Sequence, residues 1–146
     1  MKNNLAKIAQ QKKIKYFLIS FVDLFGIQRA KLVPARAISE MQKTGAGFGG
    51  FATYLDLDFA APDMFAVPDP ESLIQLPWQP DVGWLASDLV INNGPMDQCP
   101  RVILKKQINH MTELNLKMMT GVECEFFILN EEGNEVADSR AVSYTH

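Results

Sequence analysis

Two glutamates separated by one residue, Glu123 and Glu125, are the side chains in this sequence best suited to chemistry. They lie in an apolar run that reads as a strand, where alternation puts both carboxylates on one face. Two buried neighbouring carboxylates repel each other, and a divalent cation such as Mg²⁺ or Mn²⁺ removes the repulsion by taking their oxygens as ligands. A strand face open to water, with both glutamates solvated, is the alternative, and the pattern alone favours it.

The composition narrows the classes of partner. The chain of 146 residues has a net charge of −3 and no arginine-rich or lysine-rich stripe, so we expect neither nucleic acid nor an anionic membrane as a partner. No apolar run approaches the roughly 20 residues that span a bilayer, and the polar N-terminus does not resemble a signal peptide. Cys99 and Cys124 are too few for a disulfide framework, so we expect free thiols in the cytoplasm.

A second motif, G-x-G-x-x-G at Gly45, Gly47 and Gly50, matches the dinucleotide fingerprint in letters only. That fingerprint follows a strand and opens a helix, whereas a helix is expected before these glycines and none after them. We therefore interpret the stretch as a flexible loop. His110 falls on an amphipathic helix and is expected at the surface, and the terminal His146 supports no interpretation.

The elements that would carry these residues follow from periodicity and from capping residues. Asn3 and Asn4 can cap a first helix that reaches residue 13. Branched and aromatic residues then predict a hairpin of strands 14–23 and 27–33, and a second helix over residues 35–43 ends at Gly45.

The second half of the chain is expected to begin irregularly, because four prolines fall between Pro62 and Pro77. Short strands are predicted at residues 73–76 and 82–91, and a domain boundary follows the break at residues 92–95, between it and Pro100. Pro100 opens a helix to residue 115, whose inward side is predicted to carry three apolar residues: Leu104, Ile108 and Met111. The last predicted elements are a strand over residues 117–130, a turn at 131–134 and a returning strand from residue 135. The expected fold class is α+β, with a small domain over residues 1–98 and a second, incomplete one over residues 99–146.

Four motifs, in this order, resemble the glutamine synthetase family. FVDLFGIQRAKLVP (residues 21–34) is similar to its first hairpin, and PDMFAVPDPESLIQLPWQP (residues 62–80) resembles its acidic loop and the Pro-Trp-x-Pro segment. Pro100-Arg101 before a helix, and then GVECEFFIL (residues 121–129), resemble the opening of its catalytic domain. Each motif alone is weak, but together they cover almost the whole chain, and they favour the metal-ligand interpretation of the two glutamates.

The resemblance implies a β-grasp-like N-terminal domain, followed by the first helix and hairpin of a larger catalytic domain that is truncated here. It implies an ATP-dependent ligase that joins glutamate to ammonia, or to another small amine, through a γ-glutamyl phosphate intermediate. Mg²⁺ or Mn²⁺ would be the cofactor and ATP the co-substrate. The family forms homo-oligomers, as hexameric rings or dodecamers, in which the N-terminal domain completes the active site of the neighbouring subunit.

By motif position, Glu123 and Glu125 would each ligate a different metal ion, and Asp63 matches a family aspartate near the ammonium site. The alternative for Asp63 is a plain turn residue before Met64. One position departs from the family, because Gly49 stands where an aspartate usually helps to bind and deprotonate ammonium. Either Asp56 or Asp58 compensates, or the amine is larger.

The family's remaining metal ligands and its ATP and glutamate residues are expected beyond residue 146. We therefore expect the 146-residue chain to be inactive alone. A non-catalytic oligomerisation or interaction module derived from the family is the alternative, and a fragment that binds metal in its own right is a third possibility, with weak affinity expected from two carboxylates.

Overall fold

The first hairpin forms as its alternation predicts. The computed structural model describes residues 4–136. In it, helix α1 (Leu5–Lys12) begins at Asn4, whose side chain accepts a hydrogen bond from the Lys7 amide. Strand β1 (Tyr16–Val22) then pairs antiparallel with β2 (Gln28–Pro34). The predicted hairpin is confirmed to within two residues at each end.

The second helix starts later than predicted. A single 3-10 turn, η1 (Ala35–Ala37), precedes α2 (Ile38–Thr44), and Gly45 ends the helix with a positive φ of 81°. The glycine stretch is not the flexible loop that its composition predicted. Residues of β3 (Ala46–Phe48) pair antiparallel with β4 (Met64–Pro68), and a 3-10 turn, η2 (Gly50–Ala52), follows.

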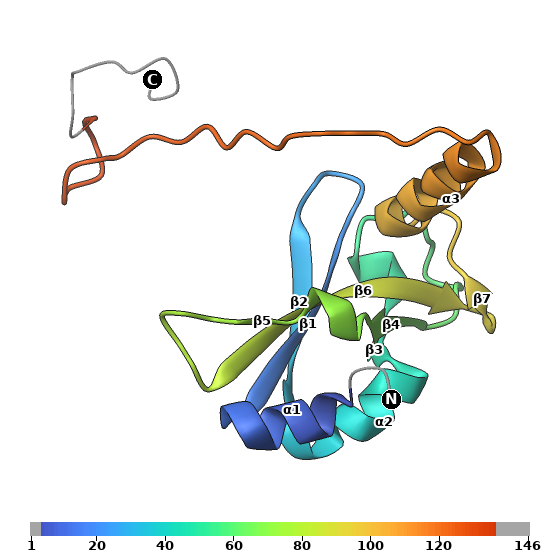
Figure 1. The fold of residues 1–146 in the computed structure, drawn as a ribbon, viewed down its shortest axis with the longest axis horizontal. Coiled ribbons are helices and arrows are strands. Elements are labelled where there is room, and N and C mark those ends of the chain that lie inside the picture. The colour runs from blue at the N-terminus through green and yellow to red at the C-terminus, as the bar shows by residue number, and fades with distance from the viewer. Residues whose placement is uncertain (1–3, 137–146) are drawn as a thin grey trace.

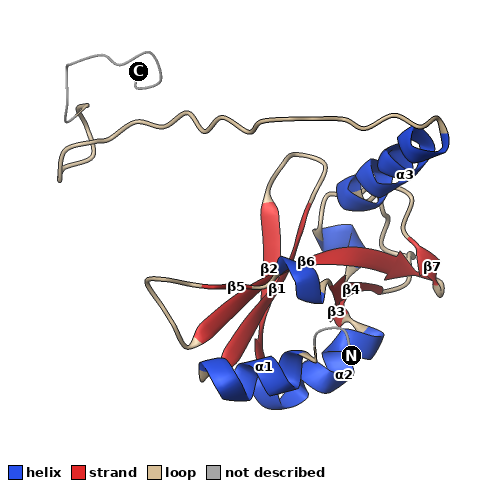
Figure 2. Cartoon of the chain, viewed as in Figure 1, coloured by secondary structure: helices blue, strands red, loops and turns tan. Residues whose placement is uncertain are grey.

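Strand β6 (Val82–Ile91) organises the sheet, with the bounds that its sequence predicted. Its first half runs parallel to β1 and its second half antiparallel to β4, which gives the order β2-β1-β6-β4-β3. Two short strands, β5 (Ile74–Gln75) and β7 (Gly94–Pro95), also pair with β6, and a 3-10 turn, η3 (Pro70–Ser72), leads into β5. The fold is therefore α+β, as expected (Figure 2).

The core lies between the sheet and the two N-terminal helices, which lie together on one side of it in Figure 1. It is built from side chains that are fully buried, namely Leu5, Phe17, Ile19, Ile38, Leu55, Met64, Leu85, Leu89 and Met96. Of these, Phe17 and Ile19 of β1 and Leu85 and Leu89 of β6 are an even number of residues apart along their strands, as side chains on one face of a sheet must be. None of the helices within residues 4–136 is long and apolar enough to cross a membrane.

Helix α3 (Pro100–Glu113) contacts the sheet differently from the prediction. Its buried residue is Val102, while Leu104 and Ile108, which were predicted to face inward, are half exposed. Met111 is partly buried. The helix touches β6 and β1 through its first turns, so most of its apolar side has no neighbour within the described residues. The predicted division into residues 1–98 and 99–146 stays a prediction.

Candidate functional site

The segment with the two glutamates is extended but unpaired. Residues 116–128 belong to no helix or strand of the described chain, and Figure 1 shows them running away from the sheet. The predicted strand 117–130 is therefore wrong for this structure, because a strand needs a neighbour to complete its hydrogen bonds and residues 4–136 offer it none. Val122, Cys124, Phe126 and Ile128, which were expected to form a core face, are exposed.

The turn after this segment is present. The Asn130 amide donates to the Glu135 carbonyl at 2.9 Å, and the bridge between Leu129 and Val136 closes it. Gly133 supplies the positive φ of 72° that such a turn requires. The returning strand predicted from residue 135, and with it His146, falls almost entirely outside the described residues.

Glu123 and Glu125 are both exposed and form no ion pair among the described residues. No group of three or more His, Cys, Asp or Glu side chains within residues 4–136 could hold a metal ion. The chemistry of the two carboxylates suits a hard cation such as Mg²⁺, but that ion takes about six oxygen ligands. The pair therefore fits part of a metal site and cannot form one alone.

Asp63 lies directly before β4 and is exposed. It lines an open hollow of about 780 Å³ together with Lys43, Thr44 and the turn residues Asn92 and Asn93. No hydrogen bond or ion pair of its carboxylate is seen among the described contacts. The structure thus places Asp63 at the start of β4 and does not bring it to the two glutamates.

Gly49 lies at the start of the irregular acidic loop that leads to Asp63. Its φ of −70° and ψ of 112° are extended values that any residue adopts. A side chain there would meet only the edge of the Phe51 ring, at 3.3 Å from its Cε1. The backbone therefore does not require glycine at this position, but a side chain there would displace the half-exposed Phe51 ring by a few tenths of an ångström.

Aromatic contacts hold this loop against the first hairpin. The Tyr54 ring meets Phe25 edge-on at 5.6 Å, and the Arg29 guanidinium lies 5.1 Å from the Tyr54 ring centre. Phe51 stacks on Phe59 at 4.7 Å. Asp56 and Asp58 remain exposed and line a hollow of about 450 Å³ with Phe51 and Tyr54.

Arg29 also forms an ion pair that the sequence did not reveal. Its Nη2 lies 2.9 Å from Oδ2 of Asp23, which is buried, and the Phe25 and Ile27 amides donate to Oδ1 of the same carboxylate at 2.9 Å each. Burial acts to raise the pKa of Asp23, but the hydrogen bonds from Ile27, Arg29 and Phe25 outweigh it, so the pKa is lowered below its ordinary value. An aspartate three residues before Gly26 in a hairpin turn was the available signal.

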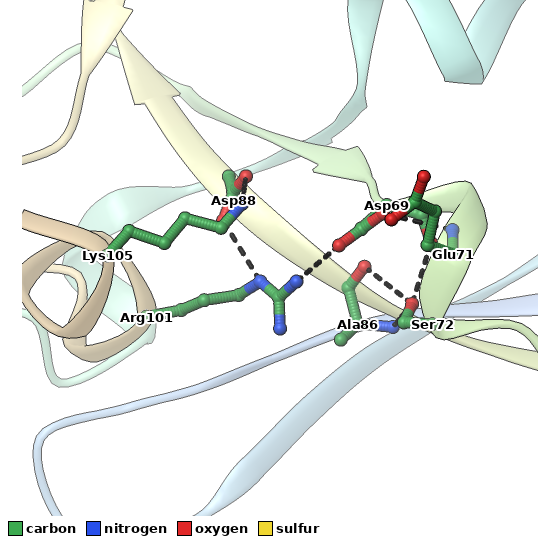
Figure 3. Close-up of polar contacts among 7 residues, drawn as sticks. All are labelled: Asp69, Glu71, Ser72, Ala86, Asp88, Arg101 and Lys105. Atoms are coloured by element: carbon green, nitrogen blue, oxygen red, sulfur yellow. Dashed lines mark hydrogen bonds and ion pairs between the residues drawn. The ribbon is translucent and has the colours of Figure 1, made fainter. Parts of the chain in front are cut away.

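A second ionic cluster joins α3 to the sheet (Figure 3). Arg101 donates from Nη2 to Asp69 at 2.5 Å and from Nε to Asp88 at 3.0 Å, and Lys105, one turn further along α3, also binds Asp88. Neither side chain was selected as a site residue from the sequence, although a spacing of four residues puts the two on one face of the predicted helix. Their acidic partners come from remote parts of the chain and could not be assigned from the sequence.

Comparisons with known proteins agree with this architecture. A family model described as "Glutamine synthetase, catalytic domain" matches residues 97–146. The chain is 56% identical to a glutamine synthetase of Rhizobium leguminosarum bv. phaseoli over 135 residues, which are 92% of the chain and 31% of that protein. It is 34% identical to a glutamate–methylamine ligase of Methyloversatilis universalis over 129 residues, 84% of the chain and 28% of that protein.

A solved structure described as a GmaS/ADP complex superposes with a TM-score of 0.90 and 51% sequence identity, over 94% of this chain and 32% of that one. A ligand-free GmaS structure gives a TM-score of 0.89. The chain therefore spans about a third of the length of these relatives.

Proposed function

Because the chain belongs to the glutamine synthetase family, we propose that it forms part of an ATP-dependent ligase that joins glutamate to ammonia or to a small amine. The observation that carries this proposal is the match over 92% of the chain to a glutamine synthetase, at 56% identity. In the proposed reaction, the γ-carboxylate of glutamate takes the terminal phosphoryl group of ATP and releases ADP. The amine nitrogen then attacks the acyl carbon, and phosphate leaves as the nitrogen loses a proton.

Glu123 and Glu125 would hold one divalent cation each, with further ligands from outside these residues. Mg²⁺ or Mn²⁺ would neutralise charge on the phosphate and carboxylate oxygens. The exposure of both carboxylates supports this role, because neither is engaged by a cation of the described chain. Asp63 would lie near the amine, on a domain that completes the site of a neighbouring subunit in a homo-oligomeric ring in the cytoplasm.

We propose an amine larger than ammonia for the acceptor. One of the matched proteins is a glutamate–methylamine ligase. Glycine at residue 49 supports the proposal, since it takes up less space than the family's aspartate and leaves that room for a methyl group. The exposed Asp56 and Asp58 offer negative charge for the cationic form of the amine.

The test is ADP release by the longest polypeptide that the gene encodes, with glutamate, Mg²⁺ and a panel of ammonia, methylamine and ethylamine. We expect turnover with at least one amine, and loss of turnover in Glu123→Gln and Glu125→Gln. Gly49→Asp should shift the preference from methylamine toward ammonia. No ADP release with any amine would refute the ligase, whereas an unchanged preference in Gly49→Asp would refute only the role of Gly49.

The alternative function, a non-catalytic interaction module, is favoured by the apolar side chains that α3 and residues 116–129 leave exposed. Light scattering on the 146-residue chain, with and without a full-length relative, distinguishes it. A strictly monomeric chain that does not bind the relative would count against the module. Titration of Mn²⁺ into the chain and into Glu123→Ala should give weak binding at most, because two carboxylates supply too few ligands.

A further inference from the structure

We propose that Arg101 is a positioning residue of the ligase, which fixes the first helix of the catalytic segment on the sheet of the N-terminal domain. The inference rests on the proposed function and concerns a residue that acts by placing other residues. Its guanidinium spans two carboxylates, with Nη2 on Asp69 and Nε on Asp88 (Figure 3). Because α3 leads directly to the segment with the two glutamates, its orientation sets the direction from which that segment leaves the domain.

The two acidic partners are themselves held firmly. Asp69 accepts a hydrogen bond from the Glu71 amide at 3.0 Å, which caps η3, and its own amide donates to the Ala86 carbonyl of β6 at 2.8 Å. The Ser72 hydroxyl donates to the Asp69 carbonyl at 2.7 Å and accepts from the Ala86 amide at 2.9 Å. Asp69 is thus fixed to the strand that also carries Asp88, so both carboxylates that Arg101 binds are held in place by the sheet.

Apolar packing contributes little to the hold on α3. Val102 is the buried residue of the helix, whereas Ile103, Leu104 and Ile108 are 43%, 51% and 50% exposed. The helix is therefore fixed at its first turns and free along the rest of its described length. A helix held in this way can pivot about its N-terminal end when the ionic contacts are removed.

The chemistry of the cluster requires arginine at residue 101. Only a guanidinium presents donors in a planar fork that reaches two carboxylates from one side chain. Lys105 adds a point charge on the second oxygen of Asp88, so the cluster holds two cations and two anions and is neutral. The side chains of the three pairs are 25–46% exposed to solvent, so salt should weaken the cluster without abolishing it.

The matched control is Lys106, the next residue of the same helix. It pairs with Asp97 at 2.5 Å, but both side chains are exposed, at 57% and 80%, and this ion pair includes neither Asp69 nor Asp88. Lys106→Met removes one charge and one ion pair from α3 while it leaves the proposed anchor intact.

Two measurements test the inference, on Arg101→Met, Arg101→Lys, Asp69→Asn and Lys106→Met. Hydrogen exchange on the 146-residue chain should show faster exchange of the α3 amides in Arg101→Met and Asp69→Asn, unchanged exchange in β1, and no effect of Lys106→Met. In the longest polypeptide, Arg101→Met should lower kcat about tenfold with KM for ATP little changed, because the site is misplaced rather than unfolded. Arg101→Lys should restore part of kcat, and salt should lower kcat more in this variant than in the parent.

A kcat of Arg101→Met within twofold of the parent, or an equal loss in Lys106→Met, would overturn the inference. If the β1 amides of Arg101→Met exchange faster by as much as the α3 amides, Arg101 stabilises the whole fold and does not position α3. That result would overturn the inference as well. If the parent itself releases no ADP with any amine, the proposed ligase fails, and the ligase role of Arg101 with it. The exchange measurement would still show whether Arg101 anchors α3.

Discussion

Two adjacent glycines offer a direct test of how the acidic loop is packed. A Cβ at Gly49 would lie 3.3 Å from Cε1 of the half-exposed Phe51 ring, which is free to move. A Cβ at Gly50, which is buried, would lie 2.4 Å from Cδ1 of Leu57, with the Cβ of Leu57 at 3.4 Å behind it. The first contact is open to adjustment, whereas the second requires the Leu57 side chain to change its packing.

The expected free-energy changes follow from these contacts. Overpacking costs about 1–3 kcal/mol, and replacing glycine by alanine recovers about 0.4–1 kcal/mol by restricting the unfolded chain. Gly50→Ala should therefore lose about 1–2 kcal/mol of stability, which corresponds to a fall in Tm of about 4–16 °C for a domain of this size. Gly49→Ala should leave the stability within about 0.5 kcal/mol of the parent or raise it slightly.

Thermal and urea unfolding, followed by circular dichroism, would measure both variants on the 146-residue chain. Leu57→Ala in the Gly50→Ala background is the matched control, because it removes the obstructing atom and should recover part of the loss. If Gly49→Ala loses as much stability as Gly50→Ala, or if Gly50→Ala is neutral, the packing argument fails. The Gly49→Asp variant could then not be used as a clean probe of amine preference.

Three further predictions concern the fold that carries the loop. Because hydrogen bonds and Arg29 lower the pKa of Asp23, its contribution to stability should be present above the ordinary aspartate pKa of about 3.9 and be lost as the pH falls below it. The difference in urea stability between the parent and Asp23→Asn should therefore shrink between pH 5 and pH 2.5. A difference that grows as the pH falls would contradict this reasoning. Leu89→Ala, at a fully buried position of β6, should cost about 2–5 kcal/mol in urea unfolding, and a loss below 1 kcal/mol would show a core looser than described. Asn4→Ala should cost about 1 kcal/mol, with Asn4→Asp close to the parent, because the side chain caps the Lys7 amide.

Local patterns predicted the elements whose stabilising residues are near in sequence. Asn4 caps α1 from the adjacent residue, and the branched and aromatic residues of β1 favour a strand. The predicted strand over residues 117–130 did not form, because residues 116–128 have no strand neighbour among the described residues. β3 was missed because its partner, Met64 to Ala66, lies beyond an irregular loop that hides the pairing.

The candidate site shows the same division. Residue types and family motifs selected Glu123, Glu125 and Asp63, but periodicity could not place them relative to one another, and the structure leaves them apart. The anchor formed by Arg101 depends on Asp69 and Asp88, which meet only when β4 and β6 pair. Such contacts belong to the tertiary fold, and a single sequence contains no local signal for them.

Strand β6 has a consequence for the order in which this chain folds. Its first half pairs with β1, as in Tyr16 with Val82, which closes a long loop of the chain. Its second half pairs with β4, as in Phe65 with Val90, which closes a short one. Closing the long loop costs chain entropy before the parallel contacts compensate for it, which slows folding. The first domain should therefore fold in a single late step that waits for β6 to be synthesised, and a ribosome-bound chain that stops before residue 82 should remain unstructured and sensitive to protease.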